Sequence, residues 1–151
     1  MSGFAQGLDL TRIDTDPEFA LGQEATAADG NTYRYCQYEA GAAAVSGVAG
    51  EVAYYDGAAA SATFVVTSDV SDSVGIGAGV LQAIMADGEY GWLQTRGPAT
   101  LSIALTAGAD GNALTAVGAG DGTLDVSGAV TDFVCAVADD ISAKMIICMF
   151  P

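Results

Sequence analysis

The side chains of this chain that could carry out chemistry are mainly carboxylates, because it contains 19 Asp and Glu residues and no His. Histidine is the usual general base near neutral pH and the commonest protein metal ligand, so the common triads and zinc sites are excluded. A cysteine nucleophile would need a base or a cation to stabilise its thiolate, and Arg34 lies two residues from Cys36. Residues two apart on a strand share a face without necessarily touching, so we interpret this pair as structural.

Two acidic segments are superficially similar to calcium-binding loops. Residues 69–75, DVSDSVG, have Val74 where an EF-hand needs glycine and Val80 where it needs the bidentate glutamate. Residues 118–125, GAGDGTLD, are similar to one turn of a calcium-binding nonapeptide repeat, which functions only when stacked copies follow. The glycine-rich run 75–79 lacks the strand and helix setting of a dinucleotide loop. We therefore predict no metal and no cofactor.

Glu89, Tyr90 and Trp92 form a third candidate, because these side chains could line a carbohydrate site. Hydrolysis of a glycoside would further require two carboxylates that converge on one cleft, which a sequence alone does not show. In the alternative interpretation, which we favour, the Tyr-Gly-Trp run anchors the core and Gly91 makes room for a close neighbour.

The cysteines do not indicate a disulfide framework. Cys36, Cys135 and Cys148 lie in apolar, strand-like runs without a Cys-x-x-Cys spacing. We predict buried free thiols, while a bridge from Cys135 to Cys148 across a terminal hairpin stays open as the alternative.

Composition predicts one folded domain that avoids nucleic acid and membranes. The chain has 151 residues, 51% of them hydrophobic, and a formal net charge of −15. A phosphate backbone and an anionic membrane surface would both repel such a chain. It contains no apolar run long enough to span a bilayer and no basic leader at residues 1–14, so we expect synthesis in a cytoplasm.

Short apolar or β-branched runs separated by Gly, Asp and Asn predict an all-β fold, a compact β-barrel or β-sandwich. We expect residues 1–17 to form a short extended N-terminal arm and residues 18–151 a single all-β domain. The expected strands lie near residues 19–26, 32–39, 48–55, 62–68, 78–86, 90–95, 99–106, 112–117, 123–127, 132–138 and 143–149. Asp87 and Gly88 are expected to form the tight turn of a hairpin between residues 78–86 and 90–95. The Ala content of residues 39–47 favours one short helix.

Three features concern burial and partners. Residues 90–109 carry no acidic side chain and one charge, Arg96, so they are predicted to be either the innermost strand or a partner face. Pro98 is expected to start a strand rather than lie inside one. The nearly all-apolar residues 144–150 are expected to be buried, either centrally in the sheet or against another subunit. Residues 107–128 are expected to be an insertion that faces solvent or a neighbouring copy.

Several segments resemble the decoration, or cement, proteins on the heads of tailed bacteriophages. They are GVLQAIMADGEYGWLQTRG at 79–97, ALGQEATAADGNTYRYCQ at 20–37, DFVCAVADD at 132–140 and AKMIICMF at 143–150. The resemblance implies a non-enzymatic virion protein made in the host cytoplasm and located on the capsid exterior. It would bind the major capsid protein of an icosahedral head, stabilise contacts between capsid subunits, and form a homotrimer or another symmetric homo-oligomer.

On this hypothesis, the apolar residues of the arm contact the capsid, namely Phe4, Leu8, Leu10 and Ile13. Tyr90, Trp92 and Arg96 are the hypothetical core or interface anchors. Two alternatives stay open: a carbohydrate-binding module of a phage fibre or tail adhesin, and a carboxylate-based hydrolase.

Overall fold

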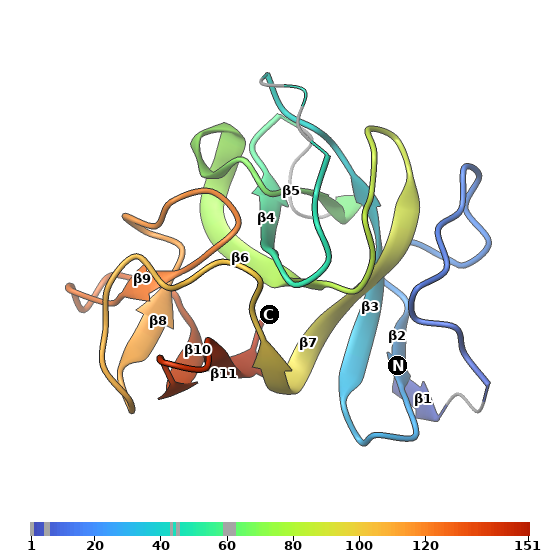
Figure 1. The fold of residues 1–151 in the computed structure, drawn as a ribbon. Helices are drawn as coiled ribbons and strands as arrows, with labels where there is room; N and C mark the ends of the chain where they lie inside the picture. The colour runs from blue at the N-terminus through green and yellow to red at the C-terminus, as the bar shows by residue number, and fades with distance from the viewer. Residues whose placement is uncertain (1, 5–6, 43, 45, 59–62) are drawn as a thin grey trace.

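The computed structural model describes residues 2–4, 7–42, 44, 46–58 and 63–151, and the regular structure of this part is almost entirely β. The predicted fold class is therefore confirmed. The strands hydrogen-bond into one strongly curved mixed sheet (Figure 1). Their bounds are β1 Ser2–Phe4, β2 Glu24–Thr26, β3 Thr32–Tyr38, β4 Val52–Asp56, β5 Val65–Thr67, β6 Ser73–Leu81, β7 Tyr90–Thr100, β8 Ala113–Thr115, β9 Asp125–Val126, β10 Val134–Asp140 and β11 Met145–Met149. A short 3₁₀ helix, η2 (Val70–Asp72), precedes β6.

Strands β3 to β7 close into a small barrel. β3 pairs in parallel with β5, and antiparallel pairings follow from β5 to β4, β4 to β6, β6 to β7 and β7 back to β3. The β6–β7 seam consists of two residue pairs, Val80 with Gln94 and Leu81 with Leu93. Alternating side chains fill the interior, which holds Cys36, Tyr38, Ala53, Tyr55, Val66, Ala78, Leu81, Met85 and Leu93. Closure pairs the edges of these strands and leaves fewer backbone groups exposed.

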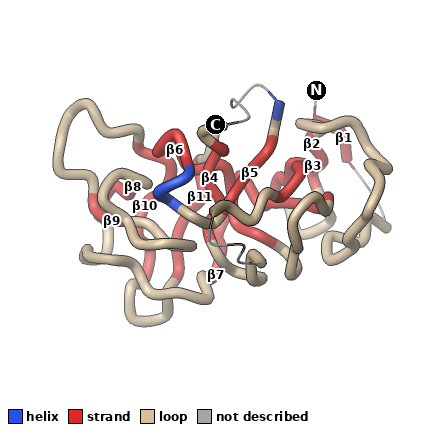
Figure 2. The backbone as a smooth tube through the Cα atoms, turned by 90° about the horizontal axis from the view of Figure 1, so that it is seen from above, coloured by secondary structure: helices blue, strands red, loops and turns tan. Residues whose placement is uncertain are grey.

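The N-terminal segment covers the outer face of β3 and β7. Tyr35 and Trp92 are buried there beneath Leu8, Leu10, Phe19 and Leu21. The backbones of Asp14 and Tyr90 exchange two hydrogen bonds, of 3.0 and 2.9 Å. Figure 2 shows the N-terminal strands on the side of the barrel opposite β8, β9 and β10. The boundary at residue 17 between an N-terminal arm and a β domain stays a prediction. Residues 8–14 pack on the barrel.

The C-terminal strands form a second layer on the other side of the barrel. The end of β7 pairs with β11, and the sheet continues through β10 and β8 to β9. Its inner face packs on β4 and β6 through Val52, Tyr54, Val80, Leu101, Leu114, Leu124, Ile146 and Phe150. Residues 107–128 were expected to be an insertion facing outward, but Leu114 and Leu124 are fully buried. This section is therefore part of the core that joins the two layers.

The predicted strand at residues 78–86 is too long. β6 ends at Leu81, and Ile84 is 64% exposed although Met85 is buried. The expected turn at Asp87 and Gly88 is present, with a 3.1 Å hydrogen bond from the Glu89 amide to the Ala86 carbonyl. β7 pairs with β3 along residues 90–96 and meets β6 only at residues 93 and 94, so a tight β6–β7 hairpin does not form.

The predicted strand at residues 99–106 is also wrong, because β7 runs on to Thr100 and irregular chain follows. Pro98 lies within β7, opposite Ile147 of β11. The Thr95 carbonyl accepts a hydrogen bond from the Phe150 amide, and the Leu101 amide donates one to the Lys144 carbonyl. The backbone N–H and C=O groups of odd-numbered residues in this part of β7 therefore point toward β11. The backbone nitrogen of Pro98, an even-numbered residue, points to the opposite side of β7. β6 does not pair with β7 at this position, so the missing N–H group of proline removes no hydrogen bond between strands.

The predicted helix at residues 39–47 is not observed. The described residues of this stretch form turns and a single bridge from Gly47 to Met85, and residues 43 and 45 lie outside the described part. Ala content favours helix only weakly, and the pairing with Met85 outweighs it.

Candidate functional site

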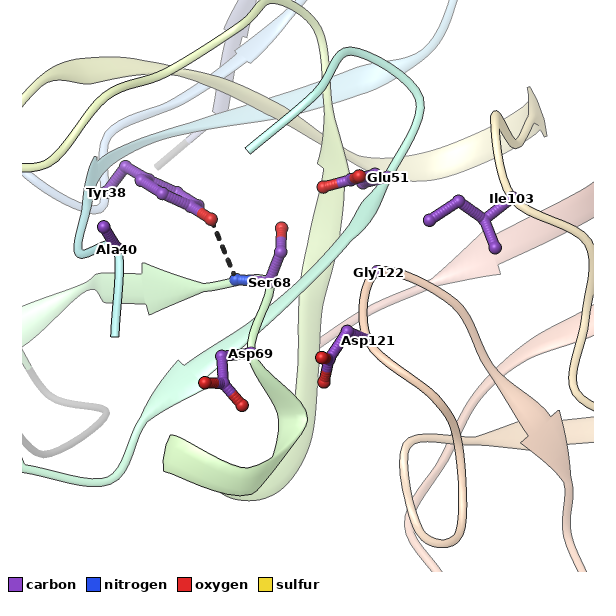
Figure 3. A pocket seen from close by; sticks show the side chains of 8 residues that line it. All are labelled: Tyr38, Ala40, Glu51, Ser68, Asp69, Ile103, Asp121 and Gly122. Atoms are coloured by element: carbon purple, nitrogen blue, oxygen red, sulfur yellow. Dashed lines mark hydrogen bonds between the residues drawn. The ribbon is translucent and has the colours of Figure 1, made fainter. Parts of the chain in front are cut away.

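Two hollows of the described surface are each lined by three carboxylates. The wider, more open one has a volume of about 670 Å³ and contains Glu39, Asp56 and Asp72. The more enclosed one opens beside the barrel, between β4, η2 and the loop before β9. Its volume is about 100 Å³, and its lining consists of Tyr38, Ala40, Glu51, Ser68, Asp69, Ile103, Asp121 and Gly122 (Figure 3). Sites for small organic ligands usually span roughly 300–1,000 Å³. The cavity suits a few water molecules rather than a substrate.

The carboxylates of this cavity have structural hydrogen bonds. Asp69 caps η2 by accepting from the amide and the hydroxyl of Ser71, at 3.0 and 2.6 Å. Asp121 accepts from the amide of Val70 at 3.0 Å, and Glu51 accepts from a backbone amide three residues earlier in the chain. Within the described residues, no three Asp, Glu or Cys side chains are grouped so that they could hold a metal. These hydrogen bonds give the cluster a structural role, the fixing of loops.

The thiols are not arranged as nucleophiles. Cys36, Cys135 and Cys148 are buried and free, so the bridge between Cys135 and Cys148 that the sequence left open is not formed. Burial raises the pKa of each thiol to about 12. Arg34 lowers the pKa of Cys36, but desolvation is the larger effect. A protonated thiol is a poor nucleophile at neutral pH.

Trp92 and Tyr35 lie at the centre of an aromatic cluster, which also contains Phe19 and Tyr90. The ring of Trp92 is 5.2 Å from those of Tyr35 and Phe19, and only 1% of the Trp92 residue is exposed. Tyr90 is partly buried and stacks on Tyr35 at 6.2 Å. A buried indole presents no face to a sugar ring, so this arrangement does not favour the carbohydrate-binding alternative. Gly91 makes room as expected, because an added Cβ would lie 3.0 Å from Ile13.

The residues predicted to contact a capsid have partners in the chain itself. Leu8 and Leu10 pack against the aromatic cluster, and Ile13 packs against the barrel core. Phe4 lies in β1, and its side chain is outside the described part. The capsid-contact role of these four residues stays a prediction.

Of the three predicted anchors, Arg96 alone is exposed. In the described chain, Arg12 pairs with Asp14 and Glu18, Arg34 pairs with Glu24, and Arg96 makes no ion pair. Its neighbours across the strands are Thr32 of β3 and Met149 of β11. Arg96 therefore does not belong to the core, and its role at an interface stays a prediction.

An exposed apolar surface extends from Arg96 over the outside of the C-terminal sheet. The outer sheet face, as we name it, consists of Pro98 in β7, Val137 in β10, and Ile147 and Met149 in β11. Ile147 is 37% and Met149 41% exposed, whereas Ile146 and Cys148 between them are buried. One face of residues 144–150 is thus buried within the chain as expected, and burial of the other face against another subunit stays a prediction. Sequence patterning missed this surface because both faces of β11 are apolar.

No described helix has the length and apolar character to cross a membrane. Comparisons with protein-family models, with curated proteins and with solved structures find no match to this chain.

Proposed function

We propose that this protein is a non-enzymatic structural component of a phage virion, a decoration protein that binds the exterior of an icosahedral head. In this role it would bury surface across boundaries between major capsid subunits and so hold them together. Such a clamp needs a stable folded body and complementary surfaces, and it needs no reactive side chain.

The arrangement of the segments with the family resemblance carries this proposal. Residues 20–37 contain β2 and most of β3, residues 79–97 contain most of β7, and residues 132–150 contain β10 and β11. β2 pairs with β3, β3 with β7, β7 with β11 and β11 with β10. Segments far apart in the sequence therefore form one continuous sheet, as expected if they specify a shared scaffold.

The chemistry of the described residues supports a binding role over catalysis. The thiols are buried with raised pKa values, and the carboxylates of the small cavity beside η2 accept hydrogen bonds that fix loops. The net charge of −15 would keep unassembled copies apart from nucleic acid.

The test is co-sedimentation of the purified chain with empty capsids of its source phage. We expect saturable binding, and capsids of an unrelated phage serve as the control. Absence of binding to the source capsid, with the chain shown by circular dichroism to be folded, would overturn the proposal.

A further inference from the structure

We propose that the outer sheet face binds a second copy of this chain across a two-fold axis. Pro98, Val137, Ile147 and Met149 form this face, and Arg96 and Asp139 lie at its opposite ends. The inference rests on the sheet register and on the charges, and it does not depend on capsid binding.

The face is apolar where an antiparallel sheet exposed to water is usually polar. Val137, Ile147 and Pro98 are cross-strand partners, so they form one row over β10, β11 and β7. Met149 follows two residues after Ile147 on the same side of β11. Contiguous apolar groups of this kind commonly mark sites where another protein binds.

The charges at the two ends of the row are opposite and free to form ion pairs. Arg96 lies opposite Met149 on β7, two residues before Pro98. Asp139 is exposed at the bulge between Ala138 and Asp140 of β10, at the other end. Neither side chain forms a hydrogen bond or an ion pair within the described residues, whereas the carboxylate of Asp140 is bonded to Ser142.

Ile147 is the centre of this arrangement. Arg96 lies on the neighbouring strand β7, opposite Met149, which is two residues after Ile147. Asp139 lies on β10, the neighbour on the other side of β11, near Met145, which is two residues before Ile147. Consider a two-fold axis that lies parallel to the face, between two facing copies and above Ile147, at right angles to the line from Arg96 to Asp139. Rotation about this axis exchanges the two positions. It brings Arg96 of each copy onto Asp139 of the other and buries the apolar row between them.

The charge of the chain favours this face as the contact between copies. Two bodies of net charge −15 repel each other over most orientations. The outer sheet face is a region where a strand without acidic residues, β7, lies beside the apolar strand β11. In the two-fold arrangement, Arg96 of each copy meets Asp139 of the other, so opposite rather than like charges come together.

The experiment measures self-association of the full chain by sedimentation equilibrium, in parallel for five variants. We expect a monomer–dimer equilibrium for the wild type and a dimer dissociation constant about tenfold higher or more for Ile147→Glu. Ile84→Glu is the matched control, since Ile84 is a more exposed isoleucine outside the face and its substitution should leave the equilibrium unchanged.

Charge exchange tests the two-fold geometry. Arg96→Asp and Asp139→Arg should each weaken the dimer by placing like charges together, and the double variant should restore it. Circular dichroism and urea unfolding verify that each variant is folded. A wild type that is monomeric throughout, a trimer, an unaffected Ile147→Glu variant, or single charge variants without rescue would each overturn the proposal. Capsid co-sedimentation is measured separately, so failure to dimerise is distinguishable from failure to bind a head.

Discussion

At the level of single residues, the barrel and its two covering layers keep buried thiols and tyrosine hydroxyls in their neutral, protonated forms. Tyr35 is fully buried, and its hydroxyl donates to the carboxylate of Asp14 at 2.6 Å. Desolvation, followed by that hydrogen bond, raises the pKa of Tyr35 to about 12. Desolvation also raises the pKa of Tyr33 to about 12, with a smaller contribution from its bond to Asp29. These phenols and the buried thiols all release protons less readily in the folded chain than in the unfolded chain.

We predict that stability falls as the solution becomes alkaline. The ordinary pKa values are 9.0 for the thiols and 10.0 for the phenols, against about 12 in the fold. The unfolded chain therefore loses protons first as the pH rises through this window, so the stabilisation is complete below pH 9 and is lost toward pH 12. Urea unfolding between pH 8 and about pH 10.5 measures it, and Cys148→Ala should show a shallower decline. A free energy of unfolding that does not change with pH would contradict the assignment.

At the level of elements, the narrow seam between β6 and β7 is the most sensitive part of the barrel. Gly79 lies at this seam, and an added Cβ there would be 2.8 Å from the Cβ of Leu93 and 2.9 Å from the carbonyl oxygen of Gln94. Both neighbours belong to β7, whose backbone is also paired with β3. The seam therefore has little freedom to widen without breaking its own two residue pairs.

We predict that Gly79→Ala lowers the free energy of unfolding by about 1–3 kcal/mol, the usual range for overpacking. Gly128→Ala is the matched control, because no atom lies within 4 Å of the added Cβ and its backbone is not left-handed. Chemical denaturation of the two variants beside the wild type gives the comparison. Equal destabilisation of both would show that the close approach at β7 is not the cause.

At the level of the whole molecule, the N-terminal segment is a covering layer of the barrel. It supplies Leu8 and Leu10 to the aromatic cluster, Ile13 to the barrel core, and Asp14 as the acceptor for Tyr35. The C-terminal sheet covers the opposite side in the same way. Removal of either layer would expose a face of the barrel that is apolar and aromatic.

We therefore predict that deletion of residues 1–15 destabilises the fold by a few kcal/mol. Leu8, Leu10 and Ile13 are partly buried, so each contributes part of the roughly 1.5–3 kcal/mol that full burial of such a side chain provides. Thermal unfolding monitored by near-ultraviolet circular dichroism, which reports Trp92 and the tyrosines, measures this loss. Thr15→Ala, at an exposed position, should leave the transition unchanged. A truncated chain with wild-type stability would show that the segment is a dispensable arm.

Local pattern was sufficient for much of the fold. Alternation in residues 32–38 and the apolar runs at 113–115, 134–140 and 145–149 correspond to observed strands, and the turn at Asp87 and Gly88 is present. The absence of histidine and the poor match of the acidic segments to metal loops were visible in the residues themselves. These features depend on side-chain type and on near neighbours, which the sequence displays directly.

Tertiary pairing decided the rest. No local signal shows that β7 pairs with β3 instead of forming a tight hairpin with β6, that Pro98 lies inside a strand, or that Leu101 and Ile103 leave the sheet. Which face of residues 145–149 meets water depends on the barrel beneath them, because both faces are apolar in sequence. Partners distant along the chain fix these outcomes, since a strand's register and burial are properties of the neighbours that it finds.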